Sequence, residues 1–198
     1  FGQYVGDQTY VRDAAGRVTS ASQSGMFAYK TDYTYRPGDD RVASVVTNVT
    51  AYSAAQYSRS YAYDARGLLA NINVPGEGDY SYGYDAVGRN VSLTYPGGMT
   101  RSQSYDLQGR LTGRCYSAAS SSRCYTAQYD AVGNPVRMTD PEGTDVIAYD
   151  ALDRVASVTR QVAGQPDQAE VYAYTALGAL RTNAGVLLDD QRPVTGGT

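Results

Sequence analysis

Short stretches in which polar and apolar residues alternate run along the chain, with the two-residue period of β-strands. Tyr61-Ala62-Tyr63 places two aromatic side chains on one face of a strand, and Arg154-Val155-Ala156-Ser157-Val158 alternates in the same way. The segments 7–13 and 167–174 do not sustain a 3.6-residue helical repeat. The longest aliphatic run, 186–188, is far shorter than the roughly 18 residues that a membrane-spanning helix needs. The pattern therefore predicts an all-β protein built from short strands.

A motif of the form Tyr-x-Tyr-Asp-x-x-Gly-Arg-aliphatic recurs along the chain. Its clearest copies begin at Tyr61 and Tyr82, and six others keep part of it. Each copy fits one β-hairpin, in which a Tyr-x-Tyr strand, a tight turn and a returning strand follow one another. The motif's aspartate position falls at 13, 36, 64, 85, 106, 130, 150 and 175. The sequence therefore predicts eight hairpins in tandem.

The Asp and Gly of the motif are expected to shape the turn. Aspartate at the first turn position can accept hydrogen bonds from backbone N–H groups two or three residues ahead, and glycine three positions later supplies the positive φ that returns the chain to the ladder through a bulge. Asp153 replaces this glycine and is a residue type that tolerates positive φ. Arg36 and Thr175 replace the aspartate, so we expect both turns to lose their side-chain acceptor and the Arg36 copy to turn differently. The predicted turn residues are Asp13, Gly16, Asp64, Gly67, Asp85, Gly88, Asp106, Gly109, Asp130, Gly133 and Asp150.

A lone two-stranded hairpin is marginal in water, so we expect the hairpins to pair edge to edge in one continuous sheet. Tyrosines of one copy would pack against aliphatic side chains of the next, and the fixed twist of β-strands would curl the sheet into a spiralling ribbon around an interior. We assign 1–8 to an N-terminal flank, 9–182 to a single module of eight repeats and 183–198 to a C-terminal flank. The predicted aromatic rungs are Tyr33, Tyr35, Tyr61, Tyr63, Tyr82, Tyr84, Tyr105, Tyr129, Tyr149, Tyr172 and Tyr174.

The composition favours a structural protein over an enzyme. The 198 residues are 42% hydrophobic, which is enough for a sizeable core. The absence of histidine excludes Ser-His-Asp and Cys-His catalysis and zinc sites that use imidazole. A net charge of -3 argues against a nucleic-acid partner. Twenty tyrosines fit a half-buried sheet, and we expect no enzymatic activity and no cofactor.

The two cysteines, Cys115 and Cys124, flank a serine-rich segment. Their settings, Arg114-Cys115-Tyr116 and Arg123-Cys124-Tyr125, are nearly identical, which suggests facing positions on two strands joined by a loop. We favour a disulfide between them, and it implies an oxidising compartment. Two reduced thiols are the main alternative, whereas a redox-active pair or a metal site is disfavoured because further ligands are lacking.

Other candidate sites have simpler structural explanations. Each motif aspartate brings a single carboxylate, too few for a calcium site. The pairs Asp39-Asp40 and Asp189-Asp190 could act as acid and base, but their arginine or turn neighbours favour solvated loops. Asn48-Val49-Thr50 and Asn90-Val91-Ser92 match the glycosylation sequon, which is a weak pattern.

Four tyrosines in the most regular region offer an alternative to a purely structural role. Aromatic faces beside arginine and aspartate can bind sugars by stacking and by bidentate hydrogen bonds. Tyrosines at a two-residue spacing are, however, more often rungs of a sheet. The four are Tyr80, Tyr82, Tyr95 and Tyr105.

The motif Tyr-Asp-x-x-Gly-Arg-Leu at this spacing resembles the YD repeats, also called Rhs repeats, of bacterial Rhs proteins, wall-associated proteins, the encapsulating subunits of insecticidal Tc toxins and animal teneurins. The resemblance covers roughly residues 9–182. It implies a hollow shell of spiralling β-hairpins that encloses a C-terminal toxin or peptide. Many family members also carry a self-cleaving aspartyl protease with an Asp-Pro signature. Asp140-Pro141-Glu142-Gly143 lies between repeats and is predicted to be a turn, so self-cleavage is not expected.

Our leading hypothesis is therefore a non-enzymatic shell module, secreted or at the cell surface of a bacterium, that protects a polypeptide cargo such as a toxin. It predicts an inward face rich in tyrosine and aliphatic residues. The alternative is a cell-surface recognition module that binds a glycan or a protein. We also expect the exposed sheet edges near Tyr4 and Val186 to pair with neighbouring shell parts or with another copy. The start of the chain, Phe1-Gly2-Gln3-Tyr4, lacks a basic leader, so an export signal is expected upstream or already removed.

Overall fold

The computed structural model describes residues 6–25, 28–49, 55–175 and 178–187, and every regular element in them is a β-strand. The chain divides into two compact units, 1–100 and 101–198. In the described residues, no helix is long and apolar enough to cross a membrane. The all-β prediction is confirmed.

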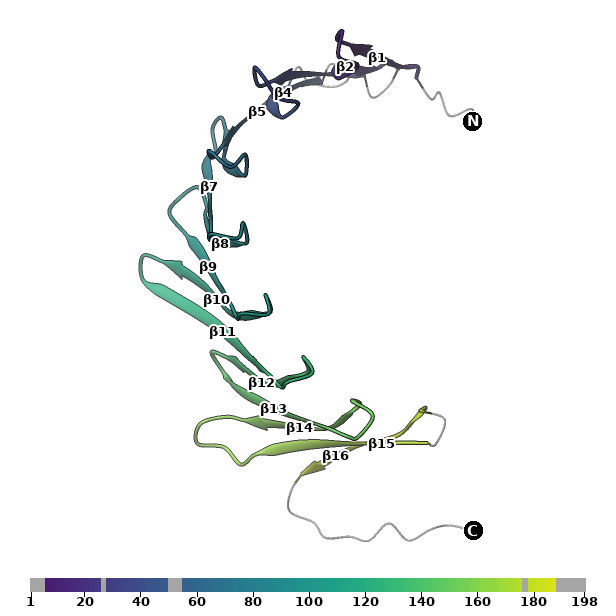
Figure 1. Ribbon diagram of the computed structural model, residues 1–198, viewed down its shortest axis with the longest axis vertical. Helices are drawn as coiled ribbons and strands as arrows, with labels where there is room; N and C mark the ends of the chain where they lie inside the picture. Colours follow the sequence, from purple (N-terminus) through teal and green to yellow (C-terminus); the bar gives the residue numbers. More distant parts are fainter. Residues whose placement is uncertain (1–5, 26–27, 50–54, 176–177, 188–198) are drawn as a thin grey trace. The chain divides into compact units, whose positions relative to one another are not determined.

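The first unit carries eight strands, and in it each strand pairs antiparallel with the next along the chain (Figure 1). The turns that follow β1, β3, β5 and β7 therefore all lie at the same end of the strands. The strands are β1 (Gln8–Arg12), β2 (Val18–Gln23), β3 (Tyr29–Tyr35), β4 (Val42–Val49), β5 (Ala55–Tyr63), β6 (Leu69–Val74), β7 (Gly78–Tyr84) and β8 (Asn90–Thr94).

The second unit repeats this arrangement with another eight strands in chain order. Its last strand extends to Leu187, five residues beyond the boundary at 182 expected for the repeats. The strands are β9 (Thr100–Tyr105, whose first residue closes the first unit), β10 (Leu111–Ala118), β11 (Ser121–Tyr129), β12 (Pro135–Asp140), β13 (Gly143–Tyr149), β14 (Val155–Gln161), β15 (Gln168–Tyr174) and β16 (Leu180–Leu187).

The motif turns share one backbone geometry. At Asp85, the backbone N–H donates to the Arg89 carbonyl oxygen at 3.0 Å, and the Gly88 N–H donates back to the Asp85 carbonyl oxygen at 3.1 Å. Gly88 has a φ of 88°, which glycine adopts without strain. The register shifts between Gly83 and Tyr84, so a bulge lies at the tyrosine that precedes the aspartate. The same pair of backbone bonds closes the turns at 13, 64, 106, 130, 150 and 175.

The three irregular copies place other residue types at the motif positions, and only the Arg36 copy changes the backbone of the turn. Asp153 takes a φ of 58° in the place of glycine. The Arg36 turn is one residue longer, because the Arg36 N–H donates to the Arg41 carbonyl oxygen, and the Asp39 carboxylate accepts the Arg41 N–H. The expected loss of an acceptor at Thr175 is wrong, since its Oγ1 accepts the Ala179 N–H at 3.1 Å. A hydroxyl oxygen can replace a carboxylate in this role.

Each unit is a single layer of sheet, so little of the chain is buried. In the described residues, the only buried hydrophobic side chains are Leu93 and Ala169, and the buried Thr31 shares a hydrogen bond with Thr47. The described residues of the two units therefore do not form the sizeable core expected from composition. Strands that contact only their sequence neighbours stabilise a ribbon through ladders and cross-strand pairs.

Candidate functional surface

One face of the first unit is lined by tyrosine and aliphatic side chains. Residues directly opposite each other on paired strands share a face, and in this way Tyr82 lies beside Leu93, and Ile72 lies between Tyr61 and Tyr80. Tyr57 is 65% exposed because no second layer covers this face. We call it the tyrosine face of the first unit and define it by Tyr33, Val45, Tyr57, Tyr61, Ile72, Tyr80, Tyr82 and Leu93.

The opposite face of the first unit is polar, and its side chains bond across the strands. Asn71 donates to Ser81 at 3.2 Å, and Asn73 donates to Asp79 at 2.8 Å. Gln56 likewise donates to Asn48, one of the sequon asparagines. Several polar side chains of this face are thus hydrogen-bonded to one another, whereas the tyrosine face offers apolar area to a partner.

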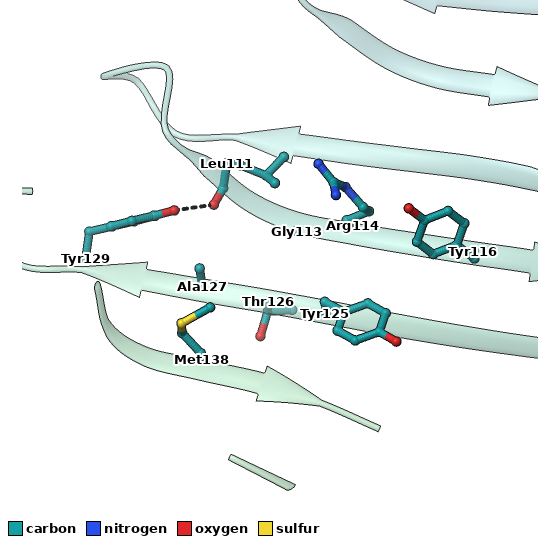
Figure 2. Close-up of a pocket in the computed structure, with 9 residues that line it drawn as sticks. All are labelled: Leu111, Gly113, Arg114, Tyr116, Tyr125, Thr126, Ala127, Tyr129 and Met138. Carbon is teal, nitrogen blue, oxygen red and sulfur yellow. Dashed lines mark hydrogen bonds between the residues drawn. The ribbon is translucent and has the colours of Figure 1, made fainter. Parts of the chain in front are cut away.

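The tyrosine face of the second unit mixes aromatic and apolar side chains with charged ones, since Arg123 lies opposite Tyr116 and Asp145 lies opposite Met138. On this face, defined by Arg114, Tyr116, Tyr125, Ala127, Met138, Ile147 and Val158, Arg114 lies opposite Tyr125 and Ala127 lies opposite Met138. A hollow of about 450 Å³ lies there. It is lined in part by these residues, which Figure 2 draws with the rest of the lining.

In six copies of the motif, the tyrosine directly before the aspartate position reaches back to the preceding hairpin. The Tyr129 hydroxyl donates to the Leu111 carbonyl oxygen at 2.8 Å, the dashed bond in Figure 2. Each such bond ties two consecutive repeats together next to the bulge. The other pairs are Tyr35 with Val18, Tyr63 with Val42, Tyr84 with Leu69, Tyr149 with Pro135 and Tyr174 with Val155, at 2.7–3.0 Å.

The first tyrosines of the motifs lie on the sheet instead. Tyr33, Tyr61 and Tyr82 belong to the tyrosine face of the first unit, and the Tyr172 hydroxyl donates to the Glu170 carboxylate. Tyr105 directly precedes its motif aspartate and so is not one of these first tyrosines, and its hydroxyl accepts a hydrogen bond from Gln103. The predicted rungs therefore fall into two groups, of which one lines the sheet and the other joins neighbouring repeats.

The motif arginine has a role that the sequence analysis did not identify. Arg110 pairs with Asp106 at 2.6 Å in its own turn, and its guanidinium lies 4.7 Å from the centre of the Tyr129 ring in the next hairpin. It also donates to the Asp130 carbonyl oxygen at 3.0 Å. Arg17 over Tyr35 and Arg154 over Tyr174 repeat the ring contact. The recurrence of arginine after the motif glycine was the signal available in the sequence.

The motif aspartates accept more hydrogen bonds than predicted. Each places one carboxylate oxygen near the N–H groups two and four residues ahead, as Asp150 does toward Leu152 and Arg154. The first of these hydrogen bonds comes from the N–H group two residues ahead, as predicted. In most copies the second comes from the N–H group four residues ahead, one residue further than predicted. Asp130 accepts the third-residue N–H of Gly133 in addition.

These contacts lower the pKa of the turn carboxyls. The hydrogen bond from the Arg17 side chain holds the pKa of Asp13 below its usual value. Desolvation raises the pKa of Asp85, but hydrogen bonds from the Arg89 side chain and backbone outweigh it. The pKa is lowered in the same direction for Asp64, Asp106, Asp130 and Asp150.

We expect the Tm to be nearly constant around neutral pH and to fall in acid. A carboxyl whose pKa is lower in the folded state stabilises the fold above its unfolded pKa, near 3.8, and this contribution is lost as the pH falls through the folded pKa. Burial raises the pKa of Tyr84 and Tyr149, which sets the alkaline limit above pH 10. Because the chain has no histidine, thermal unfolding followed by circular dichroism should give a Tm that is nearly constant between about pH 5 and pH 9 and falls by roughly 10 °C or more below pH 3. A Tm that stays level below pH 4 would contradict this assignment.

Cys115 and Cys124 lie directly opposite each other on β10 and β11, with Cα atoms 4.1 Å apart, and their sulfur atoms are bonded. The disulfide lies on the face opposite the hollow, beside the Ser117 and Ser122 hydroxyls, which share a hydrogen bond. In the described part of the chain no cysteine is free. The bond closes the outer part of this hairpin.

The other candidate residues from the sequence do not come together as a catalytic or metal site in the described part of the chain. Asp39 and Asp40 pair with Arg41 and Arg17 respectively, which fits solvated turn charges. No cluster of His, Cys, Asp or Glu suited to a metal occurs in the residues described. Asp189-Asp190 lies outside those residues. The rings of Tyr80 and Tyr95 meet edge to face with centroids 6.0 Å apart.

The fold and the repeated turn define a tandem β-hairpin repeat protein, and comparison with known proteins agrees. The family model Teneurin YD-shell matches residues 5–165, so the chain belongs to the teneurin YD-shell family. No curated protein gives a significant match.

One solved structure of a Tc toxin shell protein shows the same fold. The crystal structure of TcdB2-TccC3 without its hypervariable C-terminal region aligns with a TM-score of 0.65 at 17% identity, over 86% of this chain and 11% of that one. The TcdB2-TccC3-TEV structure aligns with a TM-score of 0.48 at 13% identity, over 91% of this chain and 11% of that one. The chain thus spans about a ninth of the length of these proteins.

Proposed function

We propose that this chain is a non-enzymatic wall segment of a secreted YD-repeat shell that encloses a polypeptide cargo such as a toxin. The observation that carries the proposal is the difference between the two faces of the sheet. In the first unit, one face exposes tyrosine and aliphatic side chains that no other described residue covers, and most side chains on the other face are polar, several of them bonded across the strands. A wall that separates a cargo from water needs two such faces.

The repeat-to-repeat contacts supply the strength that a wall needs. Within each unit, neighbouring hairpins are joined by ladders, by tyrosine hydroxyls such as those of Tyr129 and Tyr174 and, in several repeats, by an arginine over a tyrosine ring. Paired backbone groups resist proteases, because cleavage requires local opening of the strand. The disulfide fits an oxidising, extracellular setting.

The test compares two neighbouring positions on β5 that point to opposite faces. Tyr57 or Ser58 is replaced by the photocrosslinking amino acid p-benzoylphenylalanine in the complete product of the gene that encodes this chain. We expect irradiation to crosslink position 57 to enclosed polypeptide and position 58 to give no such product. Crosslinks from position 58 alone, or from neither position, would overturn the proposed function.

The alternative role in recognition has one observation in its favour. Tyr80 and Tyr82 line a smaller hollow together with Arg59 and Glu77, a combination of aromatic and hydrogen-bonding groups that suits a sugar. A glycan array probed with the purified chain tests it. Binding that is lost in Tyr82→Ala would support recognition.

A further inference from the structure

The hollow on the tyrosine face of the second unit contains an arginine without a partner. The Arg114 Nε is shielded from solvent and has no hydrogen-bond partner in the described residues. Arginines of the motif turns, such as Arg110 and Arg154, each pair with an aspartate. A buried donor without an acceptor is costly, and native structures rarely leave one without a reason.

The nearby carboxylates do not neutralise Arg114. Glu142 pairs with Arg123, and Asp145 pairs with Arg160 at 3.3 Å. In the described part of the chain no ion pair involves Arg114, so its positive charge remains uncompensated in the hollow. The planar guanidinium suits a carboxylate, which can accept two parallel hydrogen bonds from it.

The walls of the hollow are mainly aromatic and apolar. Tyr125 lies across the ladder from Arg114, Tyr116 lies two positions along β10, and Ala127 and Met138 continue the lining over the next two strands (Figure 2). Met138 is 47% exposed. A volume of about 450 Å³ with one charged donor among apolar walls is typical of a binding pocket.

We propose that this hollow binds an aspartate or glutamate side chain of a polypeptide, with apolar residues flanking the acidic one. The Arg114 guanidinium would donate to the carboxylate, and the tyrosine rings with Met138 would cover the flanking side chains. The apolar lining favours a peptide over an acidic sugar, whose many hydroxyls would need more polar partners. The inference rests on the proposed function, since it names the kind of polypeptide sequence that the tyrosine face receives.

The experiment titrates the 198-residue chain with a fluorescent, end-capped peptide of sequence Ser-Leu-Glu-Leu-Ser and with its Gln-for-Glu counterpart. Fluorescence anisotropy should show that the Glu peptide binds at least about tenfold more tightly than the Gln peptide. Arg114→Gln should remove this preference, and Arg114→Lys should retain part of it because the charge stays but the planar fork is lost. Circular dichroism of each variant checks that the fold is kept.

A second variant tests the site without removing the arginine. Ala127→Glu places a carboxylate diagonally across the ladder from Arg114, within reach of a long side chain. We expect it to occupy the hollow, abolish peptide binding and raise the Tm. Binding that is unchanged in both Arg114→Gln and Ala127→Glu would overturn the inference.

Two further outcomes are informative. Equal binding of the Glu and Gln peptides, or no binding of either, would overturn the carboxylate site. If only an acidic oligosaccharide such as oligogalacturonate binds, and does so through Arg114, the peptide assignment is wrong. The crosslinking at position 57 lies in the other unit and does not depend on Arg114, so failure of the wall function and failure of this site are distinguishable.

Discussion

Tyr129→Ala is expected to destabilise the repeats around β11 by about 3 kcal/mol. The substitution removes a half-buried ring, the hydroxyl bond to Leu111 and the contact with the Arg110 guanidinium. Tyr129→Phe keeps the ring and should cost about 1 kcal/mol. Denaturant unfolding followed by circular dichroism gives the total, and hydrogen exchange locates the loss in β10 to β12.

The matched control is Tyr125→Ala on the same strand. Tyr125 is 41% exposed, and its hydroxyl makes no hydrogen bond in the described residues. We expect a loss of about 1 kcal/mol, since only partly buried apolar area is removed. Equal losses at positions 125 and 129 would show that the bond between repeats contributes nothing.

Removal of the disulfide is expected to cost about 2–3 kcal/mol and to lower the Tm by roughly 5–10 °C. The bond closes a loop with a sequence separation of nine residues, and loop-closure entropy of the unfolded chain gives this magnitude. Strand β11 pairs with β12 only from Thr126 onward, so the outer half of the β10–β11 hairpin depends more on the disulfide and on the Arg123–Glu142 ion pair.

The measurement compares the oxidised chain, the chain treated with reductant and the double variant Cys115→Ser/Cys124→Ser. Reductant should lower the Tm of the first and leave the Tm of the double variant unchanged. Hydrogen exchange should rise in 115–125 and stay constant around the Asp150 turn. A reduced protein with unchanged Tm and exchange would contradict the assigned stabilising role.

The turns show how far local sequence determines structure. Asp and Gly at fixed spacing are enough to predict the hairpin, the bulge and even the unusual φ of Asp153, because these features depend on a few consecutive residues. The wrong prediction at Thr175 also concerns a local feature, because the threonine hydroxyl takes the place of the carboxylate as acceptor. The facing cysteines could also be inferred, because a hairpin fixes which residues lie opposite each other.

The two tyrosines of one motif differ in a way that local sequence does not predict. Tyr82 and Tyr84 are both motif tyrosines, yet one lines the sheet and the other bonds to the preceding hairpin. The bulge makes this difference, and its effect on side-chain direction appears only in three dimensions. The ring partners of Arg110 and Arg154 in the next hairpin could not be predicted for the same reason, since they lie about twenty residues further along the chain.

The sequence by itself determined the strand period, the eight turns and the family, because each is encoded in contiguous residues whose backbone preferences repeat. Only the tertiary structure decided that each unit is a single layer with almost no buried core and that Arg114 stands unpaired among tyrosines. Burial and charge pairing depend on which strands become neighbours and on what covers them. Those are properties of the assembled sheet, and no single repeat contains them.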